Sequence, residues 1–229
     1  MTISAMNLKR KHWKKIIPIA LGVIVGGLLL AFFIRVATWE ASYYAEKEGS
    51  ERAEPEVIHT DALDETPVPE EEVEVYTVPE DQPRYLVIGK LDIKSRVIPV
   101  STLPNGEVGT PNNIFDVGWY NGSSRPGFGG KILIDGHSGG PRVNGVFKKL
   151  PLLDKGDIIT IERGDGRTYD YRITENYAVD ISDANGEMRK VFKTTEKETL
   201  VLITCTGTWD SENETYDARQ FVYAELVEE

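Results

Sequence analysis

One stretch near the C-terminal end of this 229-residue chain indicates both its fold and its chemistry. It reads Leu200-Val201-Leu202-Ile203-Thr204-Cys205-Thr206-Gly207. A short run of apolar and β-branched residues that ends in Thr and Gly is typical of a buried β-strand. The run brings Cys205, the only cysteine in the chain, to the polar end of that strand. A thiol in this place is either a reactive group or a small buried apolar side chain.

A second strand-like run, Tyr216 to Ala224, follows closely and contains Arg219. Because side chains alternate between the two faces of a strand, Arg219 and Phe221 are expected to share one face. A guanidinium group is a permanent cation with a planar set of donors, so it can stabilise an oxyanion. The alternative is a surface ion pair with one of the nearby acids, Asp210, Glu212 or Asp217.

His137 is the candidate acid-base group of the folded part of the chain. It follows the strand-like run 131–135 and precedes Ser138-Gly139-Gly140-Pro141, so it is expected where a strand meets a loop. The other two histidines, His12 and His59, lie in a basic cluster and in an acidic region, outside that part.

A thiol with a pKa of about 8.5 needs a base or a cation beside it to become a nucleophile at neutral pH. An imidazole can serve as that base and can later return the proton to a leaving amine. We therefore interpret Cys205, His137 and Arg219 as one active site.

Short β-rich runs bounded by Gly or Pro recur from Arg84 onward. They lie at residues 85–89, 94–100, 131–135, 157–162, 167–173 and 175–180. Gly164-Asp165-Gly166 separates two of them and predicts a hairpin. With the runs around Cys205 and Arg219 this makes about eight strands, so we expect an all-β barrel or sandwich. Short helical turns are expected only at residues 145–150 and 188–194.

The chain before Arg84 has a different character. Residues 1–15 hold five basic side chains and no acid, and residues 16–34 carry no charge. An uncharged helix of this length spans about 28 Å, close to the hydrocarbon thickness of a bilayer. A cleavable signal peptide is the alternative, although its apolar core is usually shorter. We expect a cytoplasmic basic N-terminus at 1–15, a transmembrane signal-anchor helix at 16–38, an acidic extracytoplasmic linker at 39–83 and a catalytic domain at 84–229.

Charge is concentrated in the expected linker. The chain has a formal net charge of −11, and residues 40–83 hold fifteen acids and two bases, whereas residues 84–229 hold 22 acids and 18 bases. Such an acidic, weakly apolar segment is expected to be extended. The nearly neutral domain has no basic face, which argues against a nucleic-acid partner.

The order His137, Cys205, Arg219 in a β-rich exported domain resembles the sortase family. The resemblance covers nearly all of residues 84–229 and includes Leu202-Ile203-Thr204-Cys205, Gly118-Trp119-Tyr120 and Arg125-Pro126-Gly127-Phe128-Gly129-Gly130. The segment Val146-Phe147, followed by Leu150 and by Gly156-Asp157, adds to it. Class F and class E sortases are the most similar members.

The resemblance implies an eight-stranded β-barrel with one N-terminal membrane helix. It implies that Cys205 is the nucleophile, His137 the acid-base group and Arg219 the oxyanion or substrate-orienting residue, with Thr204, Ile203 and Phe221 in the substrate groove. Family members cut an LPXTG-like C-terminal sorting signal of secreted proteins and form a thioacyl enzyme. They then transfer the acyl group to an amine of a cell-wall precursor or of a pilin lysine.

Two other functions are weighed against this one. An L,D-transpeptidase also places His before Cys, but its motif has Ser-x-Gly before the cysteine, and this chain has Leu-Ile-Thr. A membrane-tethered β-barrel binding module would hold an unreactive Cys205. No metal site or cofactor is expected, although the acids around residues 183–187 do not exclude calcium.

Overall fold

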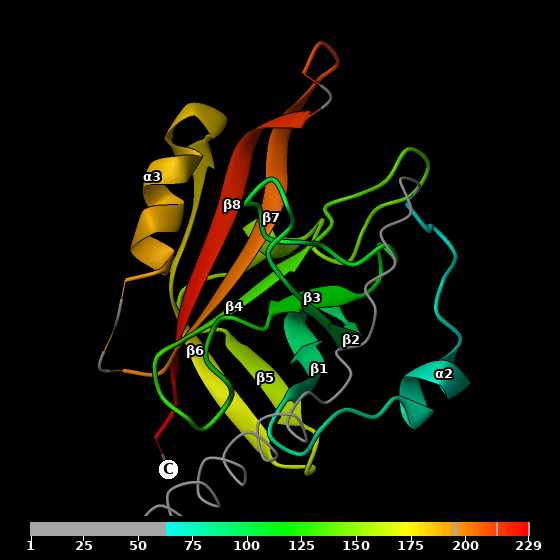
Figure 1. Cartoon of the computed structure of the whole chain (residues 1–229), viewed down its shortest axis with the longest axis vertical. Coiled ribbons are helices and arrows are strands. Elements are labelled where there is room, and N and C mark those ends of the chain that lie inside the picture. The colour runs from blue at the N-terminus through cyan, green and yellow to red at the C-terminus, as the bar shows by residue number, and fades with distance from the viewer. Residues whose placement is uncertain (1–62, 194, 196, 214, 229) are drawn as a thin grey trace, which may run out of the picture. The chain divides into compact units, whose positions relative to one another are not determined.

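The computed structural model describes residues 63–229 except 194, 196, 214 and 229. Its strands are β1 Pro83–Ile88, β2 Ile93–Val100, β3 Val117–Tyr120, β4 Lys131–Gly136, β5 Ile158–Arg163, β6 Thr168–Asp180, β7 Thr199–Asp210 and β8 Thr215–Leu226. These strands close into a barrel in the order β1-β2-β3-β4-β7-β8-β6-β5 (Figure 1). The expected all-β, eight-stranded barrel is therefore confirmed.

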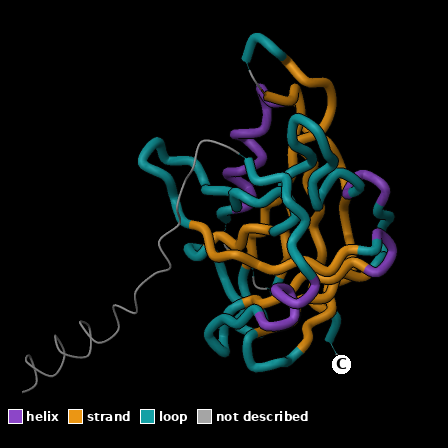
Figure 2. Tube along the Cα trace, turned by 90° about the vertical axis from the view of Figure 1, so that its right-hand side faces the viewer, coloured by secondary structure: helices purple, strands orange, loops and turns teal. Residues whose placement is uncertain are grey.

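Two of the strand pairs are parallel, and one of them, β4 with β7, contains Cys205 and leads into His137. β2 pairs with β3 in parallel, and β4 pairs with β7 in parallel, with Asp135 beside Ile203. The long strands β7 and β8 form an antiparallel hairpin that extends beyond the barrel (Figure 1). In a second view the strands form the centre and the loops surround them (Figure 2).

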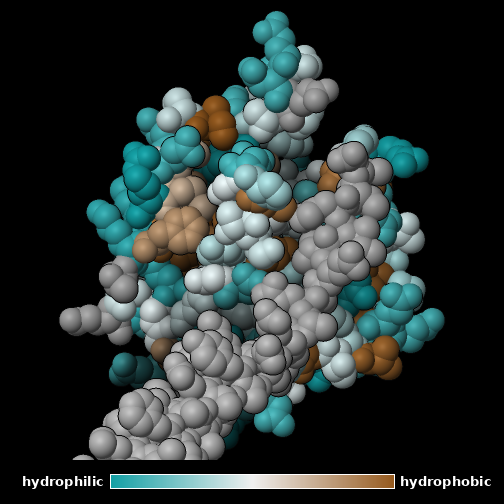
Figure 3. Space-filling view, in the orientation of Figure 1, coloured by the Kyte–Doolittle hydropathy of each residue, from teal (hydrophilic) through white to brown (hydrophobic). Residues whose placement is uncertain are grey.

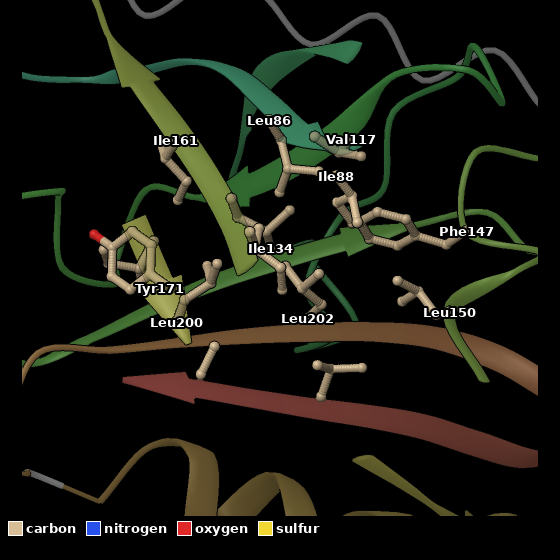
Figure 4. Close-up of a cluster of buried hydrophobic side chains, with 14 of the residues drawn as sticks. Leu86, Ile88, Val117, Ile134, Phe147, Leu150, Ile161, Tyr171, Leu200 and Leu202 are labelled. Carbon is tan, nitrogen blue, oxygen red and sulfur yellow. The ribbon is translucent and has the colours of Figure 1, made fainter. Parts of the chain in front are cut away.

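The core of the barrel is built by side chains that alternate along each strand. On β7, Leu200 and Leu202 point inward and are completely buried beside Ile134, Phe147 and Tyr171 (Figure 4). Each such apolar side chain contributes about 1.5–3 kcal/mol through its removal from water. Val201 and Ile203 lie on the opposite face of β7, because successive residues of a strand alternate. That outer face carries a second apolar cluster, which includes Leu133, Val191, Val201 and Phe221.

Helix α3, Ile181–Val191, covers part of this outer face. It packs against β6 and β8 (Figure 1) and buries Ala184, Glu187 and Val191, which lie on one side of the helix. The expected helical turn at 188–194 is thus the end of a helix that begins at Ile181. The first turns of this helix were not predicted, because Gly186 and the neighbouring Asp and Asn residues are poor helix formers.

The remaining helices among the described residues are short. They are α2 Glu70–Val75, η1 Gly89–Leu91 and η2 Leu150–Leu152. The expected helical turn at 145–150 is a run of turns that leads into η2. The face shown in Figure 3 carries hydrophobic residues in separate patches between hydrophilic ones.

The strand predictions differ from the structure in three places. β3 was not predicted as a strand, because four residues that include Gly118 carry no clear period. The two predicted strands at 167–173 and 175–180 are one strand, β6, whose register shifts between Ile173 and Glu175. The predicted hairpin between β5 and β6 is present. β7 does not end near Cys205 but continues to Asp210.

The described part of the expected linker contacts the barrel. Asp64 pairs with Asn113 in an isolated bridge, and Glu65 accepts hydrogen bonds from the backbone and side chain of Arg142. The Tyr76 hydroxyl donates to the carbonyl of Val97 at 2.8 Å. Residues 63–83 are therefore held by specific hydrogen bonds, unlike the extended segment that their charge predicts.

The predicted cytoplasmic segment 1–15, the predicted membrane helix 16–38 and residues 39–62 of the linker lie outside the described residues. Within residues 63–229, no described helix is both long and apolar enough to cross a membrane.

Candidate active site

Three neighbouring strands bring the candidate catalytic residues to one face. Cys205 on β7 is directly opposite Arg219 on β8 in the antiparallel ladder. On the other side of β7, Asp135 of β4 is in register with Ile203. His137 lies two residues beyond Asp135, as Cys205 lies two residues beyond Ile203, so the parallel register carries His137 to the level of Cys205. Cys205 and Arg219 are therefore cross-strand neighbours, and His137 follows the end of β4, the strand on the other side of β7.

Cys205 lies on the outer face of the barrel and is half-buried. It shares this face with Val201 and Ile203, since residues two apart along a strand point the same way. Burial raises the pKa of the Cys205 thiol. The positive charge of Arg219 opposes part of this rise, and the negative charge of Asp135 adds to it. At rest the sulfur is therefore a protonated thiol that needs a base.

His137 can supply that base through one defined nitrogen. Its Nε2 lies 2.8 Å from the carbonyl oxygen of Pro111. A carbonyl only accepts hydrogen bonds, so Nε2 carries a proton and Nδ1 of the neutral ring is left to exchange one. Burial lowers the pKa of the imidazole, and the hydrogen bond to Pro111 opposes part of this decrease. The shifts of the two pKa values make the neutral thiol and imidazole the main resting form.

Arg219 is held along its own strand. Its Nη1 donates to the carbonyls of Tyr216 and Ala218, both at 3.0 Å, and its Nη2 donates to Thr215 Oγ1 at 2.9 Å. In the described part of the chain it forms no ion pair with the acids that the sequence offered as partners, Asp210, Glu212 and Asp217. Its acceptors are neutral, so its positive charge stays available to Cys205.

The three predicted groove residues occupy different places. Thr204 points toward the opposite side of β7 from Cys205, is 4% exposed, and donates from Oγ1 to the carbonyl of Gly136 at 2.7 Å. This bond joins the end of β4 to β7 beside His137. Ile203 is partly buried on the face of Cys205. Phe221, opposite Ile203, is completely buried in the outer cluster.

Sequence reasoning missed three residues that contact this site. Thr110 donates from Oγ1 to Oδ2 of Asp135 at 2.6 Å, and the next residue, Pro111, bonds to His137. Oδ1 of Asp135 is buried without a partner in the described structure, and burial raises the pKa of this carboxyl to about 7. The available signal was an acidic residue inside an otherwise apolar strand, two positions before His137.

No set of three or more His, Cys, Asp or Glu side chains within the described residues is placed to hold a metal ion. The acids that left calcium open at 183–187 lie in α3, not in a loop. The carboxylate of Glu187 accepts hydrogen bonds from Tyr177 at 2.6 Å and from Tyr223 at 3.1 Å.

A shallow pocket opens on the same face as Cys205. It lies between the β3–β4 loop, β4 and the end of α3, and its lining includes Ser124, Lys131, Leu133, Phe192 and Lys193. Leu133 is four residues before His137 on β4, which corresponds to about 13 Å along a strand.

The family model for the sortase domain matches residues 86–227, more than half of the chain. The chain therefore belongs to the sortase family, whose members are cysteine transpeptidases. No curated protein sequence matches the chain.

Solved structures of sortases share the fold. Sortase C-1 from Actinomyces oris is 20% identical with a TM-score of 0.50, and the match covers 82% of this chain and 99% of that one. Streptococcus pneumoniae sortase C is 19% identical with a TM-score of 0.50, and the match covers 73% of this chain and 76% of that one. At this identity the likeness establishes the fold alone, and similarity to class F or class E stays a prediction.

Proposed function

We propose that the chain is a membrane-anchored sortase that cuts an LPXTG-like sorting signal at the C-terminus of secreted proteins. Cys205 forms the thioacyl intermediate, and an amine of a cell-wall precursor or of a pilin lysine takes the acyl group. The observation that supports the proposal is the pairing of Cys205 with Arg219 across β7 and β8, beside the strand β4 whose end leads directly into His137.

The first half-reaction breaks the peptide bond after the Thr of the signal. The Cys205 sulfur attacks the Thr carbonyl carbon while the thiol proton moves to Nδ1 of His137. The charge of Arg219 stabilises the anion that forms. The imidazolium then gives its proton to the leaving amine, which departs and leaves a thioester on Cys205.

The second half-reaction reverses the proton transfers. An acceptor amine attacks the thioester carbonyl and loses a proton to His137. The carbon–sulfur bond breaks, the new amide leaves, and the proton returns to the sulfur. Atoms and charge balance without a metal or a cofactor.

The substrate groove is proposed to run along β4 and β7. The pocket beside Leu133 lies about four extended residues from His137, which suits a signal that has three residues before the Thr that Cys205 attacks. Ile203, which is only partly buried, contacts the apolar residues of the signal, and the completely buried Phe221 supports Ile203 from beneath. Thr204 supports the groove from the inner face of β7, where its hydroxyl donates to the carbonyl of Gly136.

The location is proposed from the N-terminal sequence. The uncharged residues 16–34 follow a basic segment, which favours a single-pass helix with its N-terminus in the cytoplasm and the barrel outside the cell. The pneumococcal relative is described in terms of pilin substrate specificity. For this chain both kinds of acceptor, a cell-wall precursor and a pilin lysine, are proposed.

The test uses the full-length chain in detergent with a quenched LPXTG peptide, with and without oligoglycine. We expect cleavage that disappears in Cys205→Ala and an amine-ligated product when oligoglycine is added. Absence of cleavage with a rapidly alkylated Cys205 would reject the proposed signal while keeping a cysteine enzyme. Absence of cleavage with an inert thiol would reject the proposal as a whole.

A further inference from the structure

Two consecutive residues of the β2–β3 connection bind one side chain of β4 and the side chain of His137, which follows the end of β4. Thr110 bonds to Asp135 at 2.6 Å, and Pro111 bonds to His137 at 2.8 Å. Asp135 and His137 are two residues apart in the sequence and share one side of the chain. The two bonds therefore join residues 110 and 111 of the connection to Asp135 in β4 and to His137 just after it.

Asp135 occupies a place that is shaped for its carboxyl group. It pairs with Gly118 of β3, and a Cβ atom at position 118 would collide with Oδ1 of Asp135. Glycine is thus the residue that leaves room for this side chain. Burying a carboxyl group with one oxygen unpaired is unfavourable unless the group is neutral or its charge is compensated. An apolar residue would suit the fold better, so the carboxyl points to a role in the site.

We propose that Asp135 is a positioning residue that holds Thr110, and with it the Pro111 carbonyl, so that His137 keeps its proton on Nε2 and presents Nδ1 to Cys205. The inference rests on the proposed function, since it assigns the acid-base nitrogen of that reaction. Asp135 does not contact the substrate in this role, and it acts through the connection and the imidazole.

The charged and titratable groups around Asp135 are few. His137 lies two residues after Asp135, just beyond the end of β4, Cys205 lies on the neighbouring β7, and Arg219 lies opposite Cys205 on β8. On the β3 side the residue facing Asp135 is Gly118, which carries no charge. The carboxyl of Asp135 can therefore orient the imidazole of His137 through Thr110 and the next residue, Pro111.

The test reads the tautomer of His137 directly by ¹⁵N NMR of the full-length chain, with His137→Asn used to assign its signal. We expect the Nε2–H tautomer in the wild type and a mixture of tautomers in Thr110→Val, which lacks the hydroxyl. Thr110→Ser keeps the hydroxyl and should restore the wild-type signal. Thr102→Val is the matched control, because Thr102 lies on the same connection but bonds to Tyr120.

Peptide cleavage gives the second readout. Thr110→Val should lower kcat about tenfold, change KM less than twofold and move the pH profile, and Thr102→Val should do none of these. Asp135→Ala should match Thr110→Val, and the double variant should be no worse, because both break one linkage. If Asp135→Ala does not fold, the kinetics of Thr110→Val still test the positioning role of Asp135.

The outcomes separate the two proposals. A wild-type tautomer and wild-type kcat in Thr110→Val would overturn the positioning role and leave the proposed function standing. A tautomer change in a chain whose wild type cuts no sorting signal would support the positioning role and reject the proposed substrate.

Discussion

Cys205 on β7 and Arg219 on β8 form a directly opposed pair in the antiparallel ladder of the long hairpin. Opposed residues of such a ladder point to the same face, so the pairing fixes a permanent cation beside the thiol. The guanidinium is held by three neutral acceptors on its own strand, the carbonyls of Tyr216 and Ala218 and the hydroxyl of Thr215. The charge is therefore positioned without being neutralised.

We expect Arg219→Lys to lower kcat/KM about 10²–10³-fold, the range for loss of an oxyanion donor. A lysine keeps the charge but cannot reach Thr215 and two carbonyls at once, so it is not held in place. Arg172→Lys is the control, because Arg172 is exposed on β6. Peptide cleavage measures the effect of both variants. A near-wild-type rate in Arg219→Lys would show that Arg219 stabilises the hairpin and not the reaction.

The pH dependence of Cys205 alkylation tests the electrostatics of the site. Burial raises the pKa of the thiol, Arg219 lowers it and Asp135 raises it. Removing the negative charge in Asp135→Asn should shift the alkylation profile to lower pH, and Arg219→Gln should shift it to higher pH. Iodoacetamide labelling between pH 6 and about 11 measures this, and the signal is unambiguous because Cys205 is the only cysteine. Equal alkylation profiles in the wild type and both variants would show that neither Asp135 nor Arg219 shifts the pKa of the thiol.

Much of the site could be predicted from the sequence because its three reactive side chains are rare in this chain. A single cysteine and a single histidine within residues 84–229 leave little choice of nucleophile and base. The apolar run before His137 correctly predicts that this residue follows the end of a strand, whereas Cys205 lies inside β7, which continues to Asp210. The roles of Asp135, Thr110 and Pro111 were not predicted. These roles depend on how the long β2–β3 connection folds back toward β4, and no local sequence pattern encodes that contact.

The fold could be predicted as to class but not in detail. The strands that were found have strong alternation or continuous apolar runs, as in β7. β3 was missed because it is short and contains Gly118, and only the end of α3 was predicted because Gly186 interrupts the helix. In both cases tertiary packing overrides weak local preference.

Asp135 should also shape the stability of the fold as a function of pH. Its pKa is raised from 3.8 to about 7 by burial, so the folded state binds a proton that the unfolded state has lost. The resulting stabilisation is complete below pH 3.8, decreases as pH rises and is gone above about 7. Asp135→Asn removes this dependence, so its free energy of unfolding should fall less than that of the wild type between these limits. Urea denaturation at several pH values measures it, and parallel curves for both proteins would contradict the raised pKa.

Thr204 is expected to contribute to stability more than to substrate binding. Its hydroxyl donates to the Gly136 carbonyl in a buried place, and Thr204→Val would remove this buried hydrogen bond. We expect a loss of about 1–3 kcal/mol in the free energy of unfolding, with Thr204→Ser close to wild type. Thr208→Val is the control, because Thr208 is exposed on the same strand. A Thr204→Val variant of full stability with a raised KM would instead place Thr204 in the groove.

The last prediction concerns how α3 is held over the face of the site. Glu187 is 5% exposed, and its carboxylate accepts from the hydroxyls of Tyr177 and Tyr223 and from Lys190. Glu187→Leu would leave two partly buried hydroxyls without their acceptor, so we expect about 1–3 kcal/mol of destabilisation. Lys190→Ala breaks only the exposed side of the same cluster and should lose less than about 1 kcal/mol.

The end of α3 also lines the pocket beside Leu133, through Val191 and the following Phe192. Loosening the helix in Glu187→Leu should therefore raise KM for the sorting-signal peptide more than it lowers kcat. Lys190→Ala should leave both constants within twofold. Denaturation and steady-state kinetics on the same preparations measure the two effects. A Glu187→Leu variant that loses stability but keeps its KM would show that the peptide does not contact this part of the helix.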